Sequence, residues 1–194
     1  MNIKAVIFDL DGTITEPWFD FDAIKRRMGL DPDSGPVWET MQKMGPEQRE
    51  TVEQILNHYE NQAVQESRLN DGVAETLEIL NQRGILLGVL TRNTNRNAQS
   101  VAKKHGLVFD GYFGRDDGPL KPDCFGVLNL CDQFGVAPED CILVGDYLFD
   151  IMCAKSAGAI AVLLMSHHKN DEFRDQADFA IEKISQIIQI IDNE

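Results

Sequence analysis

Six polar residues of this 194-residue chain lie just after hydrophobic stretches or in a loop between two of them, and their side chains can do chemistry. Any one of them could serve as a helix cap or a turn residue. Together they offer carboxylates, a hydroxyl and one ammonium group, which a metal-assisted phosphate site needs. These residues are Asp9, Asp11, Thr91, Lys121, Asp146 and Asp150.

Asp9 and Asp11 follow the apolar run 5–8, which is typical of a strand buried on both faces. Because they are two residues apart, an extended backbone points both side chains the same way, beyond the carboxyl end of the strand. Two carboxylates there repel each other unless a cation lies between them or one holds a proton for acid–base work. The alternative is a hairpin turn at Asp11-Gly12, for which Glu16-Pro17 leaves only a short return segment.

The places of the remaining polar candidates depend on the expected secondary structure, in which short apolar stretches alternate with amphipathic ones. We expect strands at residues 5–8, 85–90, 112–113, 141–144 and 160–164. We expect helices from about 71 to 84, at 95–105, after Pro122 with Phe125, Leu128 and Cys131 on one side, at 150–157 and at 181–191. This alternation predicts an α/β fold, a parallel sheet with helices on both faces. Ligands of such sheets bind beyond the carboxyl ends of the strands, where the polar candidates fall.

Residues 16–69 interrupt the alternation with apolar residues at helical spacing, as in Val52, Ile55, Leu56 and Tyr59. We therefore expect a small helical cap at 16–69, inserted after the first strand of a catalytic core made of 1–15 and 70–194. The basic run 25–27 in this insertion either meets an anionic substrate group or forms a solvated helix face.

Composition narrows the possible partners. With 43% hydrophobic residues and no long apolar run, the chain is expected neither to be disordered nor to cross a membrane. The N-terminus lacks a secretory pattern, so we expect a cytoplasmic protein with reduced cysteines. A formal charge of −14 argues against nucleic acid as a partner, and it requires local positive charge if the substrate is an anion.

Four short motifs resemble, in order, those of the haloacid dehalogenase superfamily. The segment 9–13, Asp-Leu-Asp-Gly-Thr, resembles the first motif, and Thr91 after its strand resembles the second. Lys121-Pro122 resembles the third, and Gly145-Asp146 with Asp150 resembles the fourth. The resemblance implies a Rossmann-like core with a helical cap, as in the branch of phosphoglycolate phosphatases and β-phosphoglucomutases.

The resemblance also implies roles for these residues. Asp9 would be the nucleophile that accepts the phosphoryl group, and Asp11 the acid and base for the leaving alcohol and the attacking water. The presence of Asp11 favours phosphoryl transfer over dehalogenation. Lys121 would supply positive charge and Thr91 a hydroxyl donor to the phosphate oxygens. Arg92 and Asn93 would help through backbone N–H groups that open the next helix.

The metal implied by the resemblance is Mg²⁺, which prefers oxygen ligands and substrate phosphate. Asp9 and Asp146 are the expected side-chain ligands, and the backbone carbonyl of Asp11 is a third. For Asp150 three interpretations stay open: a metal ligand through water, a partner of Lys121, or a carboxylate at a helix N-terminus.

We therefore expect a Mg²⁺-dependent phosphatase that hydrolyses a small phosphorylated metabolite through an aspartyl-phosphate intermediate. One alternative is a phosphomutase of the β-phosphoglucomutase type, which returns the phosphoryl group to the sugar. Another is a catalytically silent binding protein that keeps the fold, although the chain retains all the core groups.

Overall fold

A computed structural model describes residues 2–167 and 169–193 of this chain. The chain divides into two compact units. Unit 1 comprises Met1–Pro17 and Arg68–Glu194, and unit 2 comprises Trp18–Ser67. Because the second unit is inserted between two parts of the first, each is described by itself.

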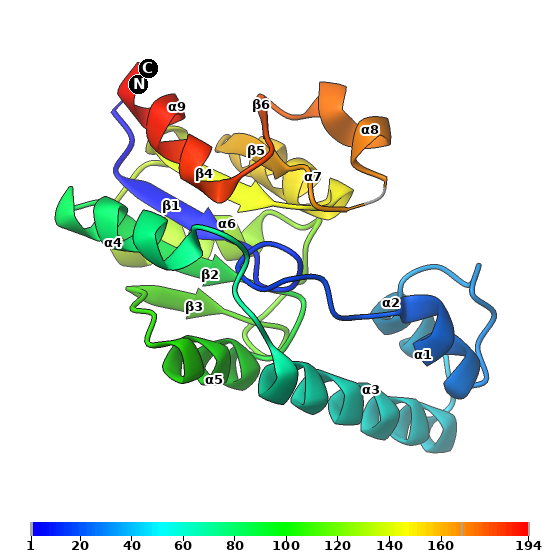
Figure 1. Ribbon diagram of the computed structural model, residues 1–194. Helices are drawn as coiled ribbons and strands as arrows, with labels where there is room; N and C mark the ends of the chain where they lie inside the picture. The colour runs from blue at the N-terminus through cyan, green and yellow to red at the C-terminus, as the bar shows by residue number, and fades with distance from the viewer. Residues whose placement is uncertain (1, 168, 194) are drawn as a thin grey trace. The chain divides into compact units, whose positions relative to one another are not determined.

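Unit 1 is built on a six-stranded sheet in which all neighbouring strands are parallel (Figure 1). The strands are β1 (Ala5–Phe8), β2 (Leu86–Leu90), β3 (Gly111–Phe113), β4 (Cys141–Gly145), β5 (Ile160–Leu164) and β6 (Phe179–Ile181). They lie in the order β3-β2-β1-β4-β5-β6. This is the order of a Rossmann-like sheet. Strands β2 and β3 are added on one side of β1, and β4, β5 and β6 are added on its other side, so the strand order reverses between β1 and β4.

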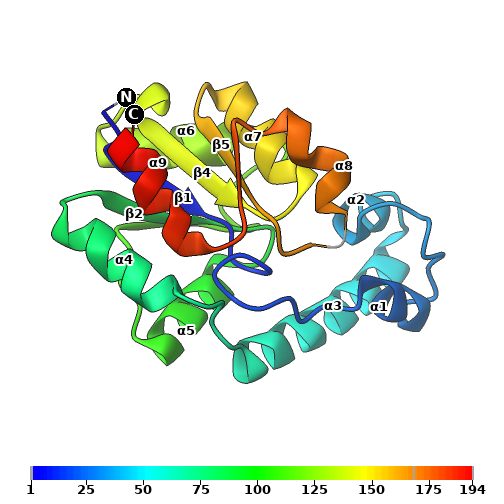
Figure 2. The same ribbon diagram turned by 45° about the horizontal axis from the view of Figure 1, so that its top comes forward.

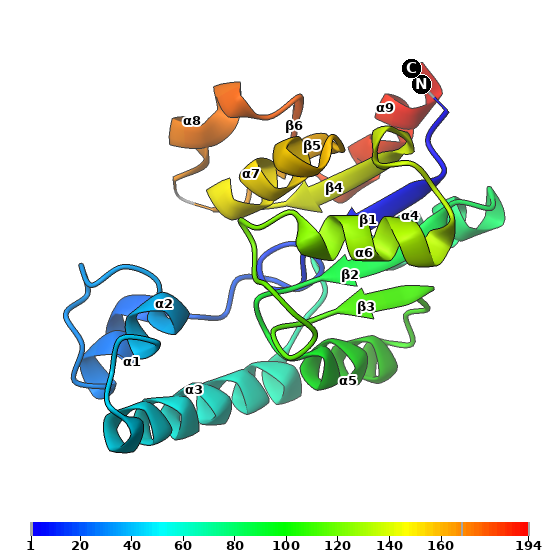
Figure 3. The ribbon, with the colours of Figure 1, turned by 180° about the vertical axis from the view of Figure 1, so that it is seen from behind.

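Helices cover both faces of this sheet, which confirms the expected α/β class. The helices of unit 1 are α4 (Val73–Gln82), α5 (Asn95–His105), α6 (Phe125–Phe134), α7 (Leu148–Ala157), α8 (Asn170–Phe173) and α9 (Ile187–Asn193). Short 3₁₀ turns occur at Pro138–Asp140, Arg174–Gln176 and Ile184–Gln186. Helices α4 and α9 lie on one face, and α6 and α7 pack beside each other on the opposite face (Figures 2 and 3).

Strand β1 lies at the centre of the sheet and leads directly to the candidate site. All four of its side chains are inaccessible to solvent, which explains why the sequence there is apolar without alternation. Its last residue, Phe8, is paired with Val89 of β2 and Val144 of β4. The next backbone amide, that of Asp9, donates to the carbonyl oxygen of Val144 at 2.8 Å. The end of β1 is thus fixed against the end of β4.

The C-terminal segment differs from the helix expected at 181–191. Ile181 instead ends the edge strand β6, and its carbonyl oxygen accepts a hydrogen bond from the backbone of Met165 at 2.8 Å. The helix α9 begins only at Ile187, after a 3₁₀ turn. A three-residue strand is too short to show a period of two, so its pairing with β5 overrides the helical pattern in the sequence.

Helix α6 also differs in the face that it buries. Phe125 and Leu128 are 44% and 41% exposed, whereas Val127, Leu130 and Cys131 are buried. Gly126 explains the orientation, because a Cβ atom there would lie 2.4 Å from a side-chain atom of Leu90. The glycine lets the helix approach β2 closely, and this turns Phe125 and Leu128 outward.

Unit 2 contains the helices α1 (Phe21–Arg27), α2 (Val37–Met41) and α3 (Pro46–Glu66). They pack around a small apolar cluster formed by Ile24, Met28, Val37, Met41, Val52 and Leu56. Gly45 and Pro46 begin the long helix α3, and proline suits that place because the first helical N–H has no intrahelical partner. Across the described residues of both units, no helix is long and apolar enough to cross a bilayer.

Candidate active site

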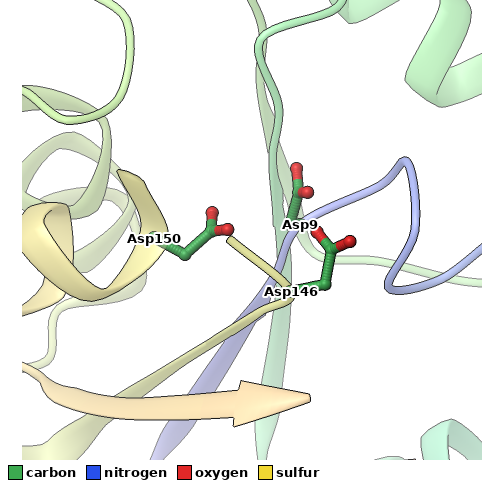
Figure 4. Close-up of side chains that lie close together, drawn as sticks. All are labelled: Asp9, Asp146 and Asp150. Carbon is green, nitrogen blue, oxygen red and sulfur yellow. The ribbon is translucent and has the colours of Figure 1, made fainter. Parts of the chain in front are cut away.

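Three carboxylates converge where the ends of β1 and β4 meet (Figure 4). Asp9 follows β1, Asp146 follows β4, and Asp150 lies in the first turn of α7. One oxygen from each lies within 4.8 Å of the others, and all three residues are buried. This is the point where the strand order reverses, and ligands of open α/β sheets bind there.

Two glycines allow these carboxylates to approach the backbone. Gly12 has a φ of 91°, and a Cβ atom there would lie 2.3 Å from a carboxylate oxygen of Asp146. At Gly145, a Cβ atom would lie 2.0 Å from the carboxyl carbon of Asp150. Any larger residue at either position would displace a carboxylate of the cluster, so these glycines are requirements of the site.

Lys121 brings the positive charge to this cluster from the connection between β3 and α6. Its Nζ donates to Oδ1 of Asp9 and to Oδ1 of Asp150, each at 2.6 Å, and its side chain is 3% exposed. Asp150 also accepts a hydrogen bond from the backbone amide of Tyr147 at 3.1 Å. Asp150 is therefore at once a partner of Lys121 and a cap of helix α7.

The buried environment of the cluster disfavours ionisation of Asp9 and Asp146. Burial raises the pKa of Asp146 to about 8, and the charges of Asp9 and Asp150 add to the shift. Burial also raises the pKa of Asp9 to about 6, against the opposing charge of Lys121. For Lys121, burial acts to lower the pKa, but Asp150 and Asp9 outweigh it and raise the pKa above its ordinary value. One ammonium group does not balance three carboxylates.

Asp11 and Thr91 are tied together through Asn93. The side-chain amide of Asn93 donates to Oδ2 of Asp11 at 3.3 Å, and its backbone amide donates to the hydroxyl of Thr91 at 3.0 Å. The hydroxyl proton of Thr91 remains able to donate, since a hydroxyl both accepts and donates. Among the described residues, Asp11 lies outside the cluster of three carboxylates. The backbone N–H of Asn93, which the sequence predicts to contact substrate, donates its hydrogen bond to the Thr91 hydroxyl instead.

Arg92 directs its side chain to the neighbouring loop. Its Nη1 donates to the backbone carbonyl of Lys121, and its guanidinium carbon lies 4.8 Å from the centroid of the Phe149 ring. The sequence suggested only a backbone role for Arg92, because a contact with residue 121 depends on the tertiary structure.

Three residues support the site although nothing in their sequence context marks them. The side chain of Asn70 donates to three carbonyl oxygens of the loop after Asp11, those of Gly12, Thr13 and Thr15, at 2.8–3.1 Å. Ser166 donates to the carbonyl of Gly12 at 2.9 Å. Asn170 is buried and donates to the carbonyl of Asp146 at 2.7 Å. These bonds hold the loops that carry Asp11 and Asp146.

The fold and this cluster define a Rossmann-like α/β protein with a buried acidic site at the switch point of its sheet. The chain belongs to the haloacid dehalogenase-like hydrolase family, whose model matches residues 19–164. The matched range includes Thr91, Lys121, Asp146 and Asp150 and begins after the segment with Asp9 and Asp11.

Individual relatives carry more specific names. The chain is 32% identical over 144 residues to a phosphoglycolate phosphatase of Mannheimia succiniciproducens, covering 72% of this chain and 64% of the relative. It is 27% identical over 221 residues to an N-acetylmuramic acid 6-phosphate phosphatase of Pseudomonas aeruginosa, covering 99% and 96%. A solved structure of a hydrolase from Pseudomonas syringae has the same fold, with a TM-score of 0.83 over 98% of both chains and 20% identity.

Proposed function

We propose that this protein is a Mg²⁺-dependent phosphatase that hydrolyses a small phosphate monoester through a phosphoaspartate on Asp9. The observation that carries the proposal is the position of Asp9. Its carboxylate lies at the switch point within a cluster of carboxylate oxygens and 2.6 Å from the ammonium group of Lys121. The phosphatase names of two relatives support the same reaction class.

The residues present fit a divalent cation. Their oxygens converge closely, and burial raises the pKa values of Asp9 and Asp146, a penalty on the ionised carboxylates that a bound cation would offset. Asp9 and Asp146 would hold Mg²⁺, together with the backbone carbonyl of Asp11, while Asp150 is engaged by Lys121 and Tyr147. When bound, the ion supplies charge neutralisation and orientation of the phosphate oxygens.

In the first half of the reaction, an oxygen of Asp9 forms a bond to phosphorus and the ester P–O bond breaks. Protonated Asp11 gives its proton to the leaving alkoxide, so that an alcohol departs. The hydrogen bond from Asn93 orients Asp11 for this transfer. The ammonium group of Lys121 and the hydroxyl of Thr91 stabilise the charge on the transferring group.

In the second half, Asp11 takes a proton from water as the water oxygen bonds to phosphorus. The bond between phosphorus and Asp9 then breaks, which releases inorganic phosphate and restores the carboxylate. The elevated pKa of Lys121 keeps its ammonium group charged through both halves. In this proposal Asp9 is the nucleophile, Asp11 the acid–base group and Lys121 the fixed positive charge.

The proposal is tested by measuring inorganic phosphate released from a panel of sugar phosphates, phosphoglycolate, nucleotides and amino-acid phosphates. We expect release from at least one ester with Mg²⁺, and none after EDTA until Mg²⁺ is restored. Activity that survives thorough chelation would contradict the metal requirement. No release from any ester in the panel would contradict the phosphatase assignment, and transfer to a second sugar hydroxyl would indicate a mutase.

We also propose that residues 16–69 act as a cap domain that determines the substrate. The groups on the core act on phosphate and give no reason to distinguish one leaving alcohol from another. Within unit 2, Lys25 donates to the carbonyl of Pro32 at 2.6 Å, whereas Arg26 and Arg27 are exposed. Of the basic run, Arg26 and Arg27 are therefore the candidates for an anionic leaving group.

Replacing Arg26 or Arg27 with Ala tests this role. If the side chain binds the leaving group, kcat/KM should fall about tenfold or more for the best anionic substrate and stay nearly constant for a generic aryl phosphate. Arg83→Ala is the matched control, because Arg83 is bonded to Asp192 at 2.6 Å in unit 1, away from the cluster. Equal losses on both substrates, or no loss from either substitution, would contradict a role in specificity.

A further inference from the structure

The side chain of Arg92 connects three segments that carry residues of the candidate site. Arg92 itself follows Thr91 at the end of β2. Its guanidinium group donates to the backbone carbonyl of Lys121 and lies 4.8 Å from the Phe149 ring centroid. Phe149 stands in the first turn of α7, one residue before Asp150. All these contacts lie within unit 1.

The backbone of Arg92 is itself held in place. Nη1 of Arg115 donates to the carbonyl oxygen of Arg92 at 3.2 Å, and the backbone amide of Arg115 donates to the carbonyl oxygen of Asn93 at 2.8 Å. Thr91, one residue earlier, is tied to β3 through a backbone bond to Phe113 at 3.0 Å. The Arg92 side chain therefore extends from a fixed backbone, which reduces the conformational entropy lost when its guanidinium group is held against Lys121 and Phe149.

Lys121 needs such support, because it lies in the irregular connection between β3 and α6. Its side chain is held by Asp9 and Asp150, and the charge of Asp9 changes in the proposed reaction when its carboxylate bonds to phosphorus. Arg92 binds the backbone of the same residue through an uncharged carbonyl that takes no part in the chemistry. This hydrogen bond from Arg92 to the Lys121 carbonyl therefore keeps its strength when the charges around Lys121 Nζ change during the reaction.

We propose that Arg92 is a positioning residue that fixes Lys121 against Asp9 and the first turn of α7, and that it acts on phosphoryl transfer only through Lys121. The proposal rests on the proposed phosphatase function. Arg suits this position better than Lys, because its planar group can lie over an aromatic ring while an edge N–H donates to a carbonyl. A group that holds another by its backbone should influence kcat more than substrate binding.

A double-mutant cycle tests whether Arg92 acts through Lys121. We would prepare Arg92→Met, Lys121→Met and the double variant, with Arg83→Met as the matched control at a surface arginine. Arg92→Met is expected to lower kcat by about tenfold to a hundredfold with little change in KM. The loss should be the same for a generic aryl phosphate and for an anionic substrate. In the Lys121→Met background, Arg92→Met should cost almost nothing more.

Other outcomes of the cycle would overturn the proposal. If the two losses multiply in the double variant, Arg92 acts independently of Lys121. If Arg92→Met reduces kcat/KM only for the anionic substrate, its guanidinium group contacts the leaving group instead. If it leaves kcat unchanged on both substrates, the contacts with Lys121 and Phe149 have no role in the reaction.

Hydrogen exchange supplies a readout that does not depend on activity. Backbone amides of segment 114–124 should exchange faster in Arg92→Met than in the wild type, while those of α4 should not change. Unchanged exchange in segment 114–124 would contradict the anchoring role. If the wild type and Arg83→Met released no phosphate from any ester, the proposed function would fail, whereas the exchange result would still decide whether Arg92 holds Lys121.

Discussion

Replacing Asp9 with Asn is expected to reduce phosphate release to background while the fold stays intact. The amide has nearly the shape of the carboxylate, so packing at the end of β1 should barely change. It lacks the negative charge and nucleophilicity needed to form a bond to phosphorus, and it is a poorer ligand for Mg²⁺. The measurement is turnover of the best substrate and of a generic aryl phosphate by Asp9→Asn.

Thermal unfolding without Mg²⁺ is the control for this variant. The pKa of Asp9 is raised to about 6 in the folded protein, above its ordinary value, so ionised Asp9 reduces stability at neutral pH. Asn removes that unfavourable charge, and the midpoint should stay the same or rise. Near-normal turnover by a well-folded Asp9→Asn protein would contradict the proposed nucleophile.

Lys121→Met is expected to lower kcat/KM by an amount equivalent to about 2–4 kcal/mol of transition-state stabilisation. Methionine keeps much of the aliphatic stem but removes the ammonium group that lies 2.6 Å from both Asp9 and Asp150. The loss should be the same for all phosphate esters, because Lys121 acts on the phosphoryl group common to them. Steady-state kinetics on two unrelated esters measures it.

This variant also leaves Asp9 and Asp150 without their buried cation, so its stability must be measured separately. We expect a lower thermal midpoint without Mg²⁺ and partial recovery when Mg²⁺ is added, because the ion offsets part of the same negative charge. Kinetics are therefore compared at Mg²⁺ concentrations where circular dichroism shows the variant to be folded. A folded Lys121→Met protein with unchanged kcat/KM would remove Lys121 from the proposed mechanism.

Most helices and strands of unit 1 were predictable from the sequence, because the faces that an element buries set the spacing of its apolar residues. A central parallel strand such as β1 must be apolar on both faces, and helix α5 ends where Gly106 adopts a φ of 68°. The edge strand β6 and the buried face of α6 were not predictable in the same way. The first is decided by pairing with β5, and the second by the close approach of Gly126 to Leu90.

The sequence by itself determined which chemical groups stand at the carboxyl ends of the strands, because Asp9, Thr91 and Asp146 each follow a recognisable apolar strand. Only the tertiary structure decided how these groups are connected. Asp150 bonds to Lys121 across 29 residues, and Asn70 bonds to the loop after Asp11 across more than 50. Such contacts, like that of Arg92 with the carbonyl of Lys121, leave no local pattern. They form between segments that become neighbours only when the sheet is assembled, and many join a side chain to a backbone carbonyl that every residue possesses.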